Sequence, residues 1–145
     1  MIFISSIEYP LGFLLGTVLR KQEALMEEAL RDLNISIKEY ALIMLLAISK
    51  ERFTQLEVGN QLSIDRTSIG LLIDKVCQKG YIAKEQNPND RRSYLIGLTK
   101  QGAEMVKQIR VIEETCSNVC LSGLEPNERN TFLNFLQIIS KEKST

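Results

Sequence analysis

The chain has 145 residues, of which 44% are hydrophobic and 25% charged, a composition typical of about one globular domain and not of a disordered or fibrous protein. Lys and Arg balance Asp and Glu, so the net charge is zero and does not by itself indicate a nucleic-acid partner. Aromatic residues are few, and Leu and Ile dominate, which favours a mostly α-helical fold.

The sequence shows no feature of a secretory signal or a membrane span. The apolar stretch 10–19 follows Glu8 rather than a basic region. The longest apolar run, 40–48, is far shorter than the ~20 residues of a spanning helix. Three cysteines, an odd number, fit reduced thiols. We therefore expect a cytoplasmic protein without a membrane partner.

Apolar residues recur with helical period from Pro10 to Leu33 and predict a first helix ending near Asn34. Proline suits the first turn of a helix, because its missing N–H would be unpaired there. Gly12 and Gly16 fall on one face, where they either permit close helix approach or only weaken the helix near its end.

Two capping boxes, in which a Ser or Thr and a Glu satisfy each other's backbone N–H, predict the next helices. Residues 36–39 (Ser-Ile-Lys-Glu) open a helix through Ile48 that is apolar nearly all round and so central to the core. Residues 54–57 (Thr-Gln-Leu-Glu) open a short helix that ends near Leu62.

Asp65 is placed to cap a further helix after a turn at residues 63–65. That helix stops at Gly80, a typical C-terminal glycine, and its predicted inward residues are Ile69, Leu72, Ile73 and Val76. Two such helices across a short turn predict a helix-turn-helix.

Segments 81–87 and 93–98 flank Pro-Asn-Asp-Arg-Arg at 88–92, which predicts a hairpin with a charged tip. Thr99 is placed to cap a long helix to about Leu121, and Pro126 begins a last one before a fraying tail at 141–145. The predicted apolar positions of the long helix are Met105, Ile109, Ile112, Cys116 and Val119.

The terminal helices carry more apolar surface than one small winged core can bury. A homodimer in which the first and last two helices interlock is the economical arrangement, and a monomeric helical bundle is the alternative. We divide the chain into an N-terminal dimerisation helix (1–35), a winged helix-turn-helix (36–99) and C-terminal dimerisation helices (100–145), all within one compact chain.

The most specific motif is Asp90-x-Arg92-x-x-x-Ile96-x-Leu98-Thr99-x-x-Gly102. With residues 65–69 (Asp-Arg-Thr-Ser-Ile), residues 79–82 (Lys-Gly-Tyr-Ile) and the order of elements, the chain resembles the MarR family of bacterial transcription regulators. The resemblance implies a mostly α winged helix-turn-helix with a small β wing, flanked by dimerisation helices. It also implies a DNA-binding regulator, a repressor that binds a palindromic operator as a homodimer and is released by a small aromatic or lipophilic ligand.

A recognition helix places its N-terminal residues against base edges in the major groove. Arg66, Thr67 and Ser68 are therefore assigned base and phosphate contacts, although solvated first-turn polarity is the alternative for Thr67 and Ser68. Ser63 and Lys75 are assigned to the same interface, and Lys75 and Lys79 face either phosphate or solvent.

In the wing, Arg91 or Arg92 is placed to enter a minor groove. The resemblance favours Arg92, with Asp90 fixing its guanidinium in a short charge-assisted pair. A solvated hairpin tip is the alternative.

The chain departs from the family at Gly70 and Leu71, where polar or basic residues are usual. Leu71 should face outward, either to meet a thymine methyl group or as a sign of weakened DNA binding. The second reading keeps open a winged-helix protein-interaction module as the alternative function.

Phe13, Arg20 and Tyr40 are the candidate effector-pocket residues, with Arg20 facing a carboxylate, although Phe13 and Tyr40 fit the core equally well. The chain has no His, so we expect no metal site and no cofactor. Cys116 and Cys120, four residues apart, are small buried thiols or a pair acting together. No motif supports catalysis, so we expect no enzyme.

Overall fold

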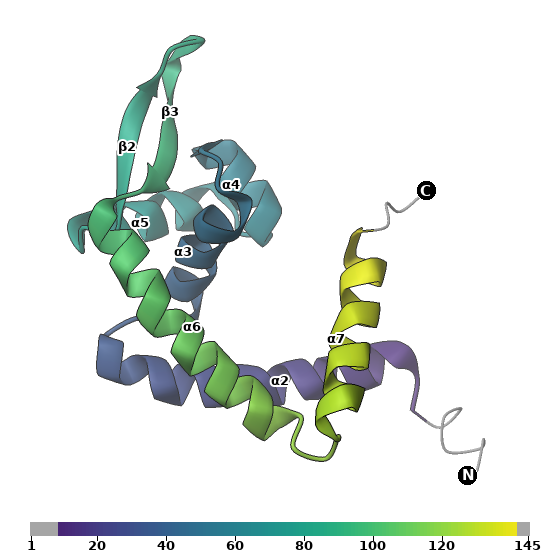
Figure 1. Ribbon diagram of the computed structural model, residues 1–145. Coiled ribbons are helices and arrows are strands. Elements are labelled where there is room, and N and C mark those ends of the chain that lie inside the picture. The colour runs from purple at the N-terminus through teal and green to yellow at the C-terminus, as the bar shows by residue number, and fades with distance from the viewer. Residues whose placement is uncertain (1–8, 142–145) are drawn as a thin grey trace. The chain divides into compact units, whose positions relative to one another are not determined.

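The computed structural model describes residues 9–141 and confirms the mostly α-helical fold with a small β wing (Figure 1). Its elements are α2 (Leu11–Leu30), the 3₁₀ turn η1 (Arg31–Leu33), α3 (Ile37–Ser49), β1 (Phe53–Thr54), α4 (Gln55–Leu62), α5 (Arg66–Gln78), β2 (Ile82–Asn87), β3 (Asp90–Leu98), α6 (Lys100–Cys120) and α7 (Pro126–Lys141). Residues 1–8 of the predicted N-terminal part and 142–145 of the predicted tail lie outside the described residues.

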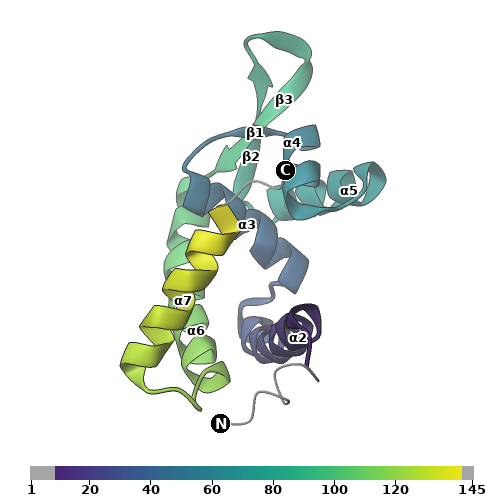
Figure 2. The ribbon, with the colours of Figure 1, turned by 90° about the vertical axis from the view of Figure 1, so that its right-hand side faces the viewer.

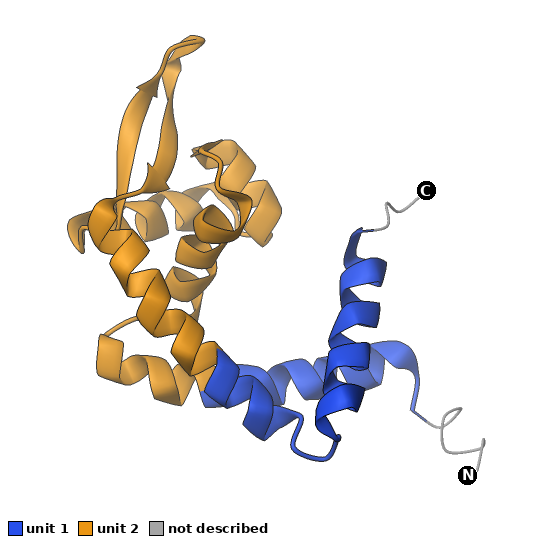
Figure 3. Ribbon diagram, viewed as in Figure 1, with its two compact units in different colours: residues 1–25, 114–145 blue, residues 26–113 orange. Residues whose placement is uncertain are grey.

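The chain forms two compact units (Figure 3). One contains residues 26–113, with α3, α4, α5 and the three strands. The other contains residues 1–25 and 114–145, with α7. Helices α2 and α6 contribute residues to both units. These units, defined by contacts, have other boundaries than the three functional parts drawn from the sequence, which remain a prediction.

Both predicted capping boxes form and fix the starts of α3 and α4. The Ser36 hydroxyl accepts from the Glu39 backbone N–H (3.1 Å), and the Glu39 carboxylate accepts from the Ser36 N–H (2.8 Å). Thr54 and Glu57 bond in the same way at 3.2 and 2.9 Å. Helix α3 supplies several of the core residues of its unit, as predicted: Leu42, Ile43, Met44 and Leu46.

Helix α5 packs through one face and ends at a glycine. Its buried residues are Ile69, Ile73 and Val76, whereas Leu72 is half-buried. Gly80 has φ +86°, a conformation that favours glycine. The N–H of Tyr81 then reaches the carbonyl of Val76 (3.3 Å), which closes the end of the helix.

The sheet is antiparallel, in the order β1-β3-β2, and β1 was not predicted (Figure 2). Strands β2 and β3 form a hairpin whose turn is only Pro88–Asn89, so the prediction of a five-residue tip is wrong. Asp90, Arg91 and Arg92 belong to β3. The register shifts between the pairs Gln86–Tyr94 and Asn87–Asp90, which leaves Arg91, Arg92 and Ser93 in a bulge of β3.

Helix α6 begins as predicted at Thr99, whose hydroxyl accepts from the Gly102 N–H (3.0 Å) and donates to the Gly80 carbonyl (2.6 Å). A Cβ at Gly102 would overlap the Tyr81 carbonyl, so the helix starts where only glycine fits. Val106, which was not among the expected apolar positions, is buried, as is the expected Ile109, whereas the expected Val119 is exposed.

The unit that holds α7 exposes many large apolar side chains. On α2 they are Leu11, Phe13, Leu14, Leu15, Val18 and Leu19, and on α7 Leu133, Phe135, Ile138 and Ile139. Helix α7 starts at Pro126, as predicted, where the Glu128 carboxylate accepts from the Glu125 N–H (2.8 Å). Across residues 9–141 no helix is both long and apolar enough to cross a membrane.

Candidate nucleic-acid interface

The N-terminus of α5 is held by Asp65, which caps it as predicted. One carboxylate oxygen accepts from the Ser68 backbone N–H and the other from the Ser68 hydroxyl, each at 2.8 Å. These bonds lower the pKa of Asp65. Arg66 and Thr67 are exposed and available for an external partner. The Ser68 hydroxyl gives its proton to Asp65, so toward a ligand it acts as an acceptor.

A groove of about 690 Å³ lies between α4, α5 and the wing. Arg66 from α5 lines it, and so do Asp90 and Arg92 from β3. The fold thus brings Arg66 together with two residues that follow it by 24 and 26 positions in the sequence. Arg91 does not line this groove. The remaining lining residues are Thr54, Gln55, Leu56, Gly59, Asn60, Ile69, Lys84, Asn87, Ser93, Tyr94 and Ile96.

The wing tip is shaped by side chains that bond its own backbone. The Asp90 carboxylate accepts from the Arg92 N–H at 3.0 Å, whereas its distance to Arg92 Nε is 3.7 Å. The prediction of a short pair between Asp90 and the Arg92 guanidinium is therefore wrong, because the closer contact of the Asp90 carboxylate is with the Arg92 backbone N–H. The Arg92 side chain is 95% exposed. The Asn87 amide donates to Ser93 Oγ (3.1 Å) across the bulge.

Two ion pairs tie the base of the wing to the rest of its unit. Lys84 of β2 reaches Asp74 of α5 at 2.7 Å, and this bond raises the pKa of Lys84. Arg52, just before β1, pairs with Glu85, which like Lys84 belongs to β2. Lys84 and Tyr94 line the groove and were missed by the sequence analysis, although the two-residue alternation of the strands could have indicated them.

Lys79 does not face phosphate or solvent, contrary to the prediction. Its ammonium lies 2.9 Å from Glu39 Oε2 and donates to the Asn34 carbonyl (2.5 Å). It is thus an internal contact between the end of α5 and the start of α3. Lys75, one turn earlier, is exposed.

The other assigned positions lie around α5. Ser63, with φ 55°, caps the end of α4 and lines a second groove of about 340 Å³ with Asp65 and Ser68. Leu71 faces outward, as predicted, and is 68% exposed. Gly70 lies under the side-chain amide of Gln55, which a Cβ there would approach to 3.1 Å.

The candidate effector residues belong to different units. Phe13 and Arg20 are exposed on α2, where Arg20 donates to Thr17 Oγ1 (3.3 Å). Tyr40, in the other unit, donates its hydroxyl to Glu113 (2.8 Å). Neither groove described above is lined by any of the three.

The thiols are free, and Cys116 is buried, which raises its pKa, whereas Cys120 is half-buried. Within residues 9–141, no cluster of three or more Cys, Asp and Glu is placed to hold a metal ion.

Comparison with known proteins gives consistent relatives. The family model of the SarA/Rot transcriptional regulators matches residues 24–109, more than half of the chain. The multiple antibiotic resistance protein MarR of Escherichia coli K12 is 30% identical over 99 residues, 68% of either chain. The crystal structure of apo MarR from E. coli superposes with a TM-score of 0.81 at 26% identity, covering 90% of this chain and 96% of that one. A mutant MarR in complex with operator DNA gives 0.74 at 25% identity, with 92% and 96% covered.

Proposed function

The chain belongs to the MarR family of DNA-binding winged-helix transcription regulators, and we propose that it is a repressor that binds a palindromic operator as a homodimer. The proposed partner is double-stranded DNA, the proposed site of action is the cytoplasm, and the proposed function is not enzymatic. The solved complex of the E. coli relative with operator DNA supports this choice of partner.

The observation that carries the proposal is the groove that Arg66 and Arg92 share. In our proposal α5 enters the major groove, where Arg66 binds guanine O6 and N7 or an adjacent phosphate, and Thr67 contacts bases or phosphate. Ser68, whose proton is held by Asp65, accepts from a base amino group. Arg92, held out by the bulge of β3, enters the adjacent minor groove, where the negative potential is strongest over A·T-rich sequence. Ser63, Lys75 and Arg91 add phosphate contacts.

The exposed apolar faces of α2 and α7 support the homodimer. Ten large apolar side chains on these helices are exposed, and a monomer rarely leaves so much apolar surface in water. A two-fold dimer presents two recognition helices, so the proposed operator has two half-sites about 34 Å apart.

Release by a small aromatic or lipophilic acid is the proposed switch, with Phe13, Arg20 and Tyr40 as its binding residues. Arg20 is exposed on α2, which leaves its side chain available to a ligand, whereas Phe13 lies on the apolar face that we assign to the dimer. The Arg20 guanidinium is the group that would meet the carboxylate of the ligand.

To test the DNA proposal, duplexes are selected from a randomised pool, and the Kd of the selected duplex is measured by fluorescence anisotropy over a salt series. Wild type should enrich a two-fold symmetric sequence and bind it with a steep salt dependence. Arg92→Ala should weaken binding by about 1–3 kcal/mol. Arg110→Ala removes an exposed arginine of α6 outside the groove and should leave the Kd for the selected duplex unchanged.

A second candidate function is a winged-helix protein-interaction module, which the exposed Leu71 favours. A selection that enriches no sequence, together with binding to random DNA that ignores Arg92, would overturn the operator proposal in favour of this one.

A further inference from the structure

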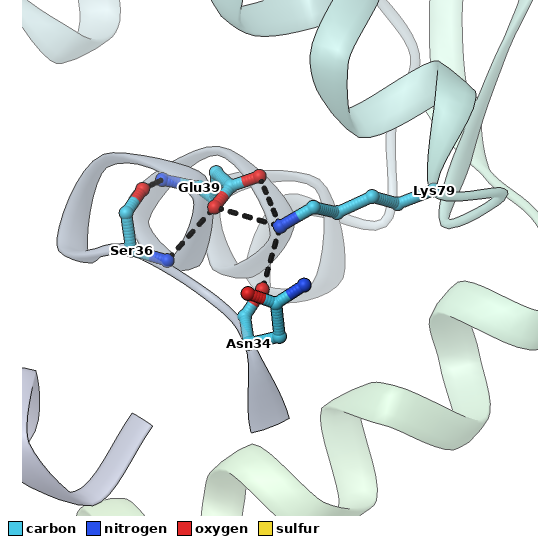
Figure 4. Close-up of polar contacts among 4 residues, drawn as sticks. All are labelled: Asn34, Ser36, Glu39 and Lys79. Carbon is cyan, nitrogen blue, oxygen red and sulfur yellow. Dashed lines mark hydrogen bonds and ion pairs between the residues drawn. The ribbon is translucent and has the colours of Figure 1, made fainter. Parts of the chain in front are cut away.

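One ammonium group joins three helix ends in the unit formed by residues 26–113 (Figure 4). Lys79 is the C-cap of α5, Asn34 is the left-handed C-cap of η1, and Glu39 stands in the first turn of α3. Lys79 Nζ lies 2.5 Å from the Asn34 carbonyl oxygen and 3.1 and 2.9 Å from the two Glu39 oxygens. We call these three residues the Lys79 junction.

The Lys79 junction is largely shielded from water, and Lys79 is the ion-pair partner of the buried Glu39 Oε2, which accepts no hydrogen bond. The side chains of Lys79 and Glu39 are 22% and 3% exposed, so salt screens their attraction much less than that of a surface pair. Burial alone would raise the pKa of Glu39, but the bonds from Lys79 and Ser36 outweigh it, and the pKa is lowered. Glu39 is therefore charged at neutral pH.

The charges of the Lys79 junction also match the helix dipoles. Lys79 stands at the negative end of α5, and Glu39 at the positive end of α3. Each charge therefore interacts favourably with the dipole of its own helix, in addition to the attraction between the two charges.

The other contacts of α5 are of different kinds. Ile69, Ile73 and Val76 bury its inner face and set its distance and crossing angle by close packing, but they make no directional polar bond. The Asp65 cap lies within the helix and its own first turn. Asp74 reaches Lys84 on the wing from an exposed position, where an ion pair contributes little. The Lys79 junction is thus the shielded, directional contact at the end of α5 opposite its DNA-facing turn.

We infer that Lys79 is a positioning residue for DNA recognition, which sets the tilt of α5 by joining its end to Asn34 and Glu39 and touches no phosphate itself. This inference rests on the proposed operator binding. A helix of 13 residues is about 20 Å long, so a small shift at its end displaces Arg66 and Thr67 from the base edges. Base contacts need closer geometry than phosphate contacts, so specificity should suffer first.

The test compares Kd for the selected duplex and for a scrambled duplex of the same composition, over a salt series. Lys79→Met removes the ammonium and keeps the stem, and Glu39→Gln keeps the capping box and removes the charge. Each should weaken binding to the selected duplex by at least about fivefold, the loss expected from one weakened base contact. Binding to the scrambled duplex and the salt slope should not change, because no phosphate contact is lost.

The double variant Lys79→Met/Glu39→Gln should bind the selected duplex as tightly as the single variant with the lower affinity, because both substitutions break the same contact. Lys75→Met is the matched control on the same helix: as a phosphate contact it should weaken both duplexes equally and lower the salt slope. Circular dichroism establishes that each variant is folded, and Glu39→Gln carries the test if Lys79→Met does not fold.

Two results would overturn the inference: unchanged specificity in folded Lys79→Met or Glu39→Gln, or a Lys79→Met protein that behaves like the Lys75→Met control. If wild type itself binds no duplex specifically, the operator proposal fails rather than the role of Lys79 within it.

Discussion

Leu71 is a large apolar side chain on the outward face of α5, 68% exposed, where a polar residue would be ordinary. If this face enters the major groove, thymine C5-methyl groups are the partners that Leu71 fits. Replacing thymines of the selected duplex by deoxyuridine removes only these methyl groups. We predict that, at one position in each half-site, this change weakens wild-type binding by about 0.8 kcal/mol per half-site.

The control is the Leu71→Ala protein, which should be indifferent to the same replacement, as measured by anisotropy at one salt concentration. Equal losses in both proteins would mean that another group reads those methyls and that Leu71 serves a different partner.

For single residues, the sequence predicted contacts with near neighbours but not contacts with residues far along the chain. The Asp65 cap and the outward position of Leu71 follow from neighbours within one helical turn, and both predictions are confirmed. Lys79 was misplaced because its partners lie 40 and 45 positions away, beyond any local pattern. The pairing of Arg92 with Asp90 was predicted too short, because residue spacing does not reveal whether a carboxylate binds backbone or guanidinium.

At the scale of elements, local capping chemistry predicted the helix starts. The Ser36 and Thr54 boxes open α3 and α4 at the predicted positions. Strand β1 escaped prediction because it has two residues and exists only by pairing with β3. The wing turn was predicted too long because charged Asp90 and Arg91 suggest a loop, whereas Asp90 pairs with Asn87 and Arg91 lies in the bulge of β3. For the candidate site, the sequence named Arg66 and Arg92 but not the groove they share.

The start of α6 depends on Gly102, whose missing Cβ makes room for the Tyr81 carbonyl between α5 and β2. We predict that Gly102→Ala destabilises the fold by about 1–3 kcal/mol, because the backbone of one segment must shift. The free energy of unfolding in urea measures this loss.

Gly123→Ala is the matched control, since a Cβ at Gly123 meets no atom within 4 Å. It should change stability by less than about 0.5 kcal/mol. Equal stability of the two variants would show that the Tyr81 carbonyl moves aside freely.

At the scale of the whole molecule, the proposed homodimer has a direct test in solution. Phe135 is exposed on α7, among the apolar side chains that we assign to the interface. We predict that wild type is a dimer and that Phe135→Glu is a folded monomer at micromolar concentration, because the substitution buries an unpaired charge in the interface. Sedimentation equilibrium measures both masses.

Ile48→Glu is the control, because Ile48 is also exposed, at 68% against 58% for Phe135, but lies near the end of α3, outside the proposed interface. It should remain dimeric. A monomeric wild type, or a dimer that Phe135→Glu leaves intact, would contradict the proposed arrangement.

The bulge at the wing tip has an evolutionary consequence. Residues 88–92 are all exposed, and the bonds that shape the tip are made among its own residues. A lineage can therefore exchange side chains there with little loss of folding stability. Helix α5 lacks this freedom, since its inner face is core. Divergence among descendants of this chain should thus accumulate at the tip positions outside the family motif, Pro88 and Asn89, sooner than along the inner face of the recognition helix.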